Sequence, residues 1–205
     1  MTIETRSREL VLVQRSTGLD LSLAPLQGLW TEAQYLVLTD GTNQLIEFTD
    51  GHIEVLPMPT RNHQIMLLQL YGLLETFLQL PRGIVLVAPL RLQIRPGKYR
   101  EPDVLLLLDE RDERNQNAFW LGADLVVEIV SPDDPERDTV DKVADYAEAN
   151  IPEYWIVNPL EATITVLMLA GDAYATHGIF QRGQTATSPL LPGLAVDVDA
   201  MFADA

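Results

Sequence analysis

Hydrophobic and polar residues change their spacing several times along the chain, and each change predicts a different element. Apolar and polar residues alternate on both sides of Asp50-Gly51, which is typical of a β-hairpin with a tight turn. Residues 60–80 then carry apolar side chains at helical spacing, with Thr60 as a candidate N-cap and Pro81 beyond the end. These patterns predict a hairpin that is followed by a long amphipathic helix.

Two nearly unbroken apolar runs in the middle of the chain predict strands that are covered on both faces. They fall in residues 102–108 (PDVLLLL) and 123–131 (ADLVVEIVS), and continuous short runs of this kind are typical of buried strands. A helix is predicted over 134–151 and a further strand over 153–159. From residue 163 onward, short alternating pieces are separated by Gly-containing turns.

The order of these elements predicts one α/β domain over residues 29–205. A hairpin, a helix, central strands, a second helix and a strand are followed by a β-rich C-terminal region. Residues 1–28 carry little pattern and are predicted to form an N-terminal arm. A chain of 205 residues is long enough to bury the core of one such domain.

The composition restricts the kinds of site that the protein can build. The chain has no cysteine, which excludes disulfides and thiolate metal sites and fits a reducing cytoplasm. Any metal must therefore be held by carboxylates, carbonyls or histidine, which favours hard ions such as Mg²⁺ or Mn²⁺. No apolar run is long enough to span a bilayer, and the first residues lack the pattern of a signal peptide. We therefore expect a cytoplasmic protein without a membrane partner.

The net charge of −16 argues against tight nonspecific binding of nucleic acid, because such binding depends on basic residues that neutralise phosphates. DNA binding would need a local basic patch, and one candidate exists. Arg91, Arg95, Lys98 and Arg100 fall within one short window, and Arg91, Gln93 and Arg95 would share one strand face. The alternative is an edge strand with an ordinary solvated face.

Two carboxylates flank or interrupt the apolar strands, and this position needs a physical reason. Asp103 directly precedes the first run and Glu128 lies inside the second. A buried ionised carboxylate is costly unless it is paired or binds a cation. If the strands are neighbours, both acids could hold one ion, with the carbonyl of Ile129 as a further ligand; such an ion assists phosphoryl transfer. Alternatively, Asp103 caps a strand and Glu128 pairs with Arg100 or Lys142.

Several segments of the chain together resemble a known family. "REPDV" and "VVEIV" resemble the PD-(D/E)XK nuclease motif. From about Leu29 to Phe202, the order and spacing of "DGHIEVLPMPTRNHQ", "GADLVVEIVSP", "RDTVDKVADYAEANIPEYWIVNP" and "SPLLPG" are similar to the Uma-two family of putative restriction endonucleases. The resemblance implies a restriction-endonuclease-like core, with a mixed central sheet flanked by helices. It also implies a DNA endonuclease activity that depends on Mg²⁺ or Mn²⁺.

The resemblance also assigns roles to individual residues. Asp103 matches the Asp of the PD motif and Glu128 the acid of the second half-motif, but Val130 stands where the superfamily pattern has Lys. Lys142 in the following predicted helix could supply the missing ammonium, to hold the attacking water or neutralise charge on the phosphate. The alternative for Lys142 is an ordinary pair with Asp138, four residues away, on a solvated helix face.

Two further residues match positions of the family that support the ion. Glu47 lies in the predicted hairpin and His63 early in the first long helix. Glu54 replaces Glu47 as the hairpin acid if the strand faces the other way. By chemistry alone, His63 could equally be a capping or polar core group. Tyr146 and Tyr154 are expected to pack in the core rather than to stack on bases.

The leading hypothesis from the sequence is a metal-dependent endonuclease that hydrolyses DNA phosphodiester bonds. One alternative is a catalytically degenerate nuclease-fold protein that acts as a binding or assembly module, which the Val at position 130 and the acidic composition favour. Another is a metal-dependent nucleotide phosphohydrolase, for which an acidic surface is less of an obstacle. A homodimer is possible, with the apolar C-terminal end as a contact.

Overall fold

The computed structural model describes residues 2–6, 9–14, 19–42, 44–78 and 83–203. The chain divides into two compact units: unit 1 comprises Met1–Met58 and Arg95–Glu101, and unit 2 comprises Pro59–Ile94 and Pro102–Ala205. The division predicted after residue 28 stays a prediction.

Unit 1 begins with a small antiparallel sheet in place of the patternless arm that the sequence suggested. Its strand order is β1-β2-β3, and each strand pairs with the next along the chain. A single turn of 3₁₀ helix, η1 (Ala24–Leu26), follows. The strands are β1 (Thr2–Arg6), β2 (Glu9–Gln14) and β3 (Leu19–Ser22).

Two local signals fix the next elements of unit 1. Thr31 and Gln34 close a capping box at the start of α1 (Glu32–Asp40). Asp50 and Gly51 both have positive φ, 45° and 86°, which is the backbone of the tight hairpin turn predicted there. The turn joins β4 (Ile46–Thr49) to β5 (His52–Val55), and β4 also pairs with β8 (Lys98–Arg100).

An aromatic cluster forms the core of unit 1. The ring of Tyr35 stacks on Phe48, with centroids 5.0 Å apart, and lies 5.3 Å from the ring of Tyr99. The Tyr35 hydroxyl donates to the carbonyl of Ile46 (2.9 Å), and the Tyr99 hydroxyl donates to Glu32 (2.7 Å). These contacts hold α1 against β4 and β8, since each buried hydroxyl has a partner.

The centre of unit 2 is a mixed six-stranded sheet with the order β13-β12-β11-β10-β9-β6. Only β10 and β11 are parallel; the other neighbours are antiparallel. Every residue of β9 and β10 is buried, as the unbroken apolar runs predicted. The strands are β6 (Ile84–Val87), β9 (Val104–Leu107), β10 (Leu125–Ile129), β11 (Glu153–Asn158), β12 (Thr163–Ala170) and β13 (Ala173–Gln181).

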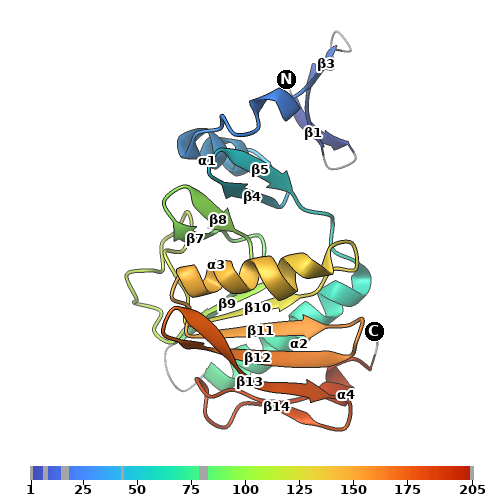
Figure 1. Ribbon diagram of the computed structural model, residues 1–205, viewed down its shortest axis with the longest axis vertical. Coiled ribbons are helices and arrows are strands. Elements are labelled where there is room, and N and C mark those ends of the chain that lie inside the picture. Colours follow the sequence, from blue (N-terminus) through green and yellow to red (C-terminus); the bar gives the residue numbers. More distant parts are fainter. Residues whose placement is uncertain (1, 7–8, 15–18, 43, 79–82, 204–205) are drawn as a thin grey trace. The chain divides into compact units, whose positions relative to one another are not determined.

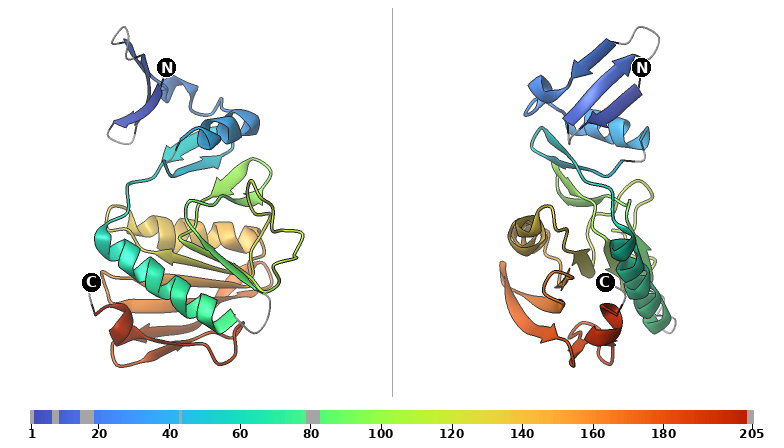
Figure 2. Two further views of the ribbon diagram at one scale, coloured as in Figure 1. Left: turned by 180° about the vertical axis from the view of Figure 1, so that it is seen from behind. Right: turned by 90° about the vertical axis from the view of Figure 1, so that its right-hand side faces the viewer.

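Helices cover both faces of this sheet, as Figures 1 and 2 show. One face packs against α2 (Arg61–Leu78), and the other packs against a π-helical turn, η2 (Arg137–Asp141), that continues into α3 (Lys142–Glu148). Since successive strand residues point to opposite faces, Val104 and Leu106 join the α2 side and Leu105 joins the α3 side.

The long helix α2 starts where the sequence predicted. The backbone N–H of His63 donates to the side chain of Thr60 at 3.2 Å, so Thr60 caps the helix. Leu73 fits the helical spacing of apolar residues but is 41% exposed, whereas Leu67 is buried. No helix in the described parts of the chain combines the length and apolarity needed to cross a bilayer.

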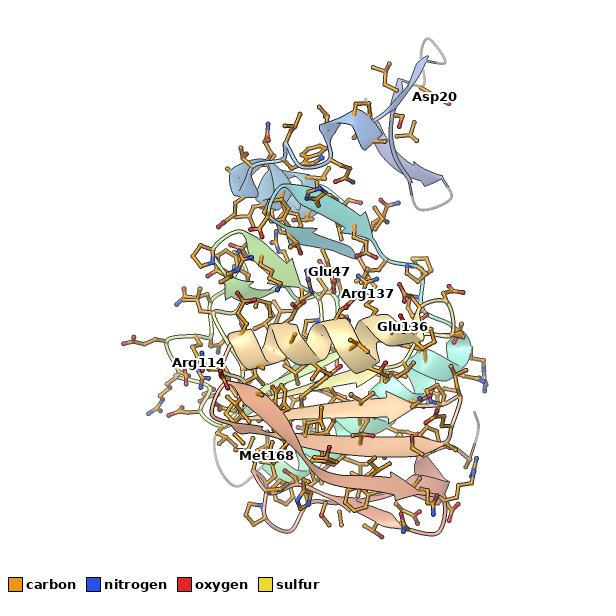
Figure 3. All side chains as sticks on the ribbon, in the orientation of Figure 1. Asp20, Glu47, Arg114, Glu136, Arg137 and Met168 are labelled. Carbon is orange, nitrogen blue, oxygen red and sulfur yellow. The ribbon has the colours of Figure 1, made fainter. Side chains whose placement is uncertain are left out.

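The long connection between β9 and β10 is closed by one arginine, Arg114 (Figure 3). Its guanidinium lies 2.7 Å from both Asp112 and Asp124, and Asp124 also accepts from the backbone N–H of Leu108 (2.8 Å). The hydrogen bonds from Arg114 lower the pKa of Asp112 to about 2. Both ends of the connection are therefore fixed next to the strands.

The C-terminal segment packs on the same side of the sheet as α2 and is fastened by a buried acid. Glu153 accepts hydrogen bonds from Trp155 Nε1 (2.6 Å), Ser188 Oγ (2.6 Å) and the backbone N–H of Leu190 (2.8 Å). Glu153 lies opposite Met168 of β12, and Met168 is labelled in Figure 3. The segment contains β14 (Thr185–Thr187), β15 (Ala195–Asp197) and α4 (Val198–Met201), whose apolar residues join the core.

Replacing Glu153 by Ala is expected to lower the free energy of unfolding by about 2–4 kcal/mol, because three buried donors lose their acceptor. Urea denaturation measures this difference. The matched control is Glu75→Ala on an exposed position of α2, which should stay within about 0.5 kcal/mol of wild type. Equal stability of Glu153→Ala and the control would show that the carboxylate does not anchor the segment.

Candidate functional site

The two acids singled out in the sequence come from neighbouring strands. In the antiparallel pair of β9 and β10, Val127 lies opposite Val104, and the same register continued by one residue sets Glu128 opposite Asp103. Directly opposite residues of an antiparallel pair point to the same face. Both carboxylates therefore belong to the sheet face that α3 covers.

Asp103 is held through one of its two carboxylate oxygens. Its Oδ2 accepts a hydrogen bond from the backbone N–H of Ile129 (2.8 Å) and lies 3.1 Å from Nε2 of His63. His63 reaches it from the first turn of α2. Among the described residues, none donates to Oδ1 of Asp103, so this oxygen remains available to a ligand.

Glu128 is held in the same way, although it is far more buried. The side chain is 2% exposed. Its Oε1 lies 2.8 Å from Nζ of Lys142 and also accepts from the hydroxyl of Tyr146. Within the described ranges, Oε2 receives no protein donor. Each of the two acids is thus fixed by one oxygen and keeps the other oxygen for a ligand.

A stripe of polar residues on η2 and α3 faces Glu128. Asp138, Lys142 and Tyr146 recur every four residues, and all three are buried. Asp138 Oδ1 lies 3.1 Å from Nζ of Lys142, and Asp138 Oδ2 accepts from the backbone N–H of Ser131 (3.4 Å). The pair of Asp138 and Lys142 exists, but the solvated helix face considered for it is wrong, because both side chains are packed onto the sheet.

The electrostatics of the cluster follow from this burial. Burial raises the pKa of Glu128; the charge of Lys142 lowers it, the charges of Asp103 and Asp138 raise it again, and the result is a pKa of about 8. Burial lowers the pKa of His63, but the hydrogen bond and charge of Asp103 outweigh this effect and the pKa is raised. Burial is thus the main cause of the raised pKa of Glu128, whereas the carboxylate of Asp103 is the cause of the raised pKa of His63.

The donor set fits a hard divalent ion that also binds water and substrate. Within the described part of the chain, no three His, Asp or Glu side chains form a complete metal site. Mg²⁺, however, is usually held by only one or two carboxylates together with waters and substrate phosphates. Asp103 Oδ1 and Glu128 Oε2 could supply this half-shell. The Ile129 backbone N–H is used by Asp103, and a role for the Ile129 carbonyl stays a prediction.

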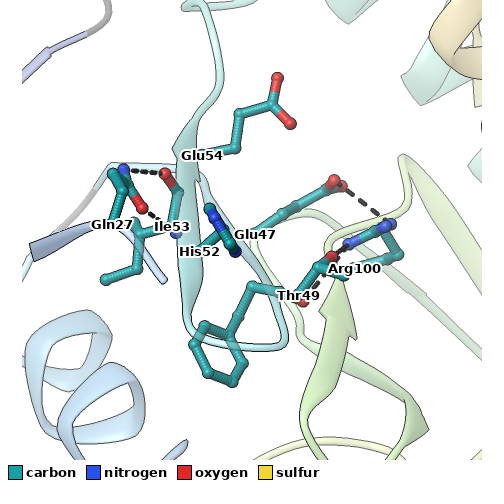
Figure 4. Close-up of a pocket in the computed structure, with 8 residues that line it drawn as sticks. Gln27, Glu47, Thr49, His52, Ile53, Glu54 and Arg100 are labelled. Carbon is teal, nitrogen blue, oxygen red and sulfur yellow. Dashed lines mark hydrogen bonds and ion pairs between the residues drawn. The ribbon is translucent and has the colours of Figure 1, made fainter. Parts of the chain in front are cut away.

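Glu47, the predicted supporting acid, lies in a cavity of about 270 Å³ within unit 1 (Figure 4). Its carboxylate is buried, lies 3.6 Å from Nε of Arg100 and accepts from the backbone N–H of Glu101 (3.2 Å). Glu54 stands opposite Glu47 on β5 and lines the same cavity, but it is exposed. The part of Glu47 in holding an ion stays a prediction.

The predicted basic strip is largely engaged in bonds within the protein. Strand β7 (Leu92–Arg95) alternates buried and half-buried residues as expected. Arg95 forms a two-pronged pair with Asp50, at 2.7 and 2.8 Å. Arg100 pairs with the buried hairpin acid, and Arg91 donates to a loop carbonyl at 3.0 Å. Contact of these residues with DNA remains a prediction.

The sequence missed two residues of the cluster. Tyr146 was expected only as a core residue, and it is fully buried, yet its hydroxyl also binds Glu128. Asp138 was considered only as a surface partner of Lys142. The four-residue spacing of Asp138, Lys142 and Tyr146 predicted that they share one helix face, but not that this face binds Glu128.

Comparisons with known proteins are consistent with this geometry. A family model, Uma2, described as "Putative restriction endonuclease", matches residues 32–199. No curated protein matches the chain. A solved structure of a putative nuclease belonging to DUF820 from Anabaena variabilis is similar, with a TM-score of 0.65 and 19% identity over 77% of this chain and 89% of that one.

The solved structure bears on the fold alone at this level of identity, and it confirms the predicted fold class, a nuclease-like core with a mixed sheet flanked by helices. The family model covers well over half of the chain and agrees with the resemblance carried by the sequence segments. The chain belongs to the Uma2 family of putative restriction endonucleases.

Proposed function

We propose that the protein is a DNA endonuclease that depends on a divalent ion and hydrolyses phosphodiester bonds. Asp103 and Glu128 would hold this ion. The observation that carries the proposal is the arrangement of these two acids. They share one sheet face on adjacent strands, and each keeps one carboxylate oxygen without a protein donor. Membership of a family of putative restriction endonucleases supports the same class of substrate.

The surrounding residues are suited to hold the two acids in place. A bound Mg²⁺ or Mn²⁺ would lower the pKa of a water molecule and stabilise negative charge on the phosphate. The Ile129 N–H and His63 fix Asp103, while Lys142 and Tyr146 fix Glu128. Because these contacts exist before any ligand binds, the acids need little rearrangement.

Lys142 supplies the positive charge that the superfamily pattern places at position 130, where this chain has a valine. Val130 is 1% exposed and belongs to the apolar cluster beneath α3, so the strand offers no ammonium there. Lys142 brings one to within 2.8 Å of Glu128 from the helix. In the proposed reaction this positive charge stabilises charge that develops on the phosphate.

The first prediction concerns binding of the ion and cleavage together. Wild type is expected to bind Mn²⁺ in calorimetry and to nick supercoiled plasmid in Mg²⁺ or Mn²⁺. Asp103→Asn and Glu128→Gln should each weaken Mn²⁺ binding by at least about tenfold and abolish nicking, since one of two protein ligands is lost. Glu136→Gln, at an exposed position before η2 (Figure 3), is the matched control.

The outcomes separate the competing functions. Ion binding that is lost in Asp103→Asn, together with no cleavage of any DNA by wild type, would indicate a binding or assembly protein. Hydrolysis of nucleotides in place of plasmid would indicate a phosphohydrolase. Cleavage that survives Asp103→Asn would eliminate the proposed site.

The second prediction uses the raised pKa of Glu128 and needs no activity. Without metal, the folded protein holds the Glu128 proton up to a pKa of about 8, whereas the unfolded chain releases it near the ordinary value of 4.5. The contribution of Glu128 to stability is therefore complete below about pH 4.5 and is lost as the pH rises toward 8. Glu128→Gln cannot ionise, so its stability relative to wild type should increase from pH 5 to pH 8.

Urea denaturation in EDTA at several pH values measures this relative stability. Glu75→Gln, which changes an exposed carboxylate on α2, serves as the control and should follow wild type at each pH. A difference between Glu128→Gln and wild type that does not change with pH would contradict the buried environment described for Glu128.

A further inference from the structure

We infer that the ammonium of Lys142 fills the position that a second cation would occupy, so that the site takes one divalent ion and not two. The inference rests on the proposed function, because it concerns the number of ions held beside Asp103 and Glu128. Nucleases that hold two ions place them about 3.5–4 Å apart, on either side of the reacting phosphate. In this protein one of those two places already contains a positive charge of the chain.

The contacts of Lys142 are those of a bridging cation. Its Nζ lies 2.8 Å from Oε1 of Glu128 and 3.1 Å from Oδ1 of Asp138, and all three side chains are nearly buried. The two oxygens of Glu128 therefore differ: Oε1 binds the ammonium, and Oε2 is the oxygen left for the proposed ion. A second divalent ion could reach Oε1 only by displacing Lys142.

Tyr146 also distinguishes the two carboxylate oxygens of Glu128. Its hydroxyl donates to the same Oε1 that Lys142 approaches, so this oxygen has two donors from consecutive turns of one helix. The π-helical turn η2 precedes Lys142 and carries Asp138, and such turns are frequent at functional sites. Together these contacts hold the ammonium in one place, since its stem is packed between the helix and the sheet.

The charges of the side chains in the cluster also favour a single divalent ion. Asp103, Glu128 and Asp138 carry three negative charges when ionised, and Lys142 carries one positive charge. One divalent ion neutralises the remaining two negative charges. A second divalent ion beside Lys142 would leave two excess positive charges in a buried cluster, whereas without Lys142 it would leave only one, so the lysine makes a second ion more costly.

The experiment counts bound Mn²⁺ in the purified full chain by calorimetry and by electron paramagnetic resonance. Wild type is expected to bind one ion per chain and to show the spectrum of an isolated Mn²⁺. Lys142→Met removes the charge and keeps much of the stem, and it is expected to bind two ions with a magnetically coupled spectrum. Lys98→Met changes the only other lysine of the chain, and this control should bind one ion.

Each result decides between distinct conclusions. Two ions in wild type, or a single ion bound by Lys142→Met, would overturn the inference and leave the metal site itself standing. No ion in wild type, or binding that Asp103→Asn does not weaken, would instead refute the proposed function. Should Lys142→Met fail to fold by circular dichroism, Lys142→Gln takes its place, because an amide can bond to both carboxylates without carrying charge.

Discussion

The position of Glu128 is the constraint on which the rest of unit 2 depends. A carboxylate in the middle of an apolar strand is tolerated only when hydrogen bonds and an opposite charge replace the water that it loses. The chain meets this requirement with Lys142 and Tyr146, which both approach the same oxygen. The helix that carries them must therefore lie directly over β10, and the apolar residues around Tyr146 fill the remaining space on that face.

The elements with strong local signals could be predicted from the sequence. The Asp50-Gly51 turn and the Thr60 cap depend on residues that are close in the chain, and each forms where it was expected. The two apolar runs predicted strands covered on both faces, because a strand with one solvated face would alternate. The first three strands, β1 to β3, were missed, since short strands joined by short connections gave no clear period.

The candidate site was predictable only in part, because its contacts come from tertiary structure. The spacing of Asp138, Lys142 and Tyr146 showed that they share a helix face, but not that this face is turned toward the sheet. The π-helical turn and the hydrogen bond from Tyr146 to Glu128 have no local signal. The register that sets Asp103 opposite Glu128 could be assumed, but only the pairing of β9 with β10 establishes it.

The parallel pairing of β10 and β11 has a consequence for how such a site can be built. Parallel neighbours cannot be joined by a hairpin and need a crossover, which is usually a helix; here η2 and α3 provide it. In this chain the crossover lays a helix across the strand that bears the acid. A cationic side chain on the crossover can therefore reach the acid, and the strand position of Val130 is left to pack in the apolar cluster.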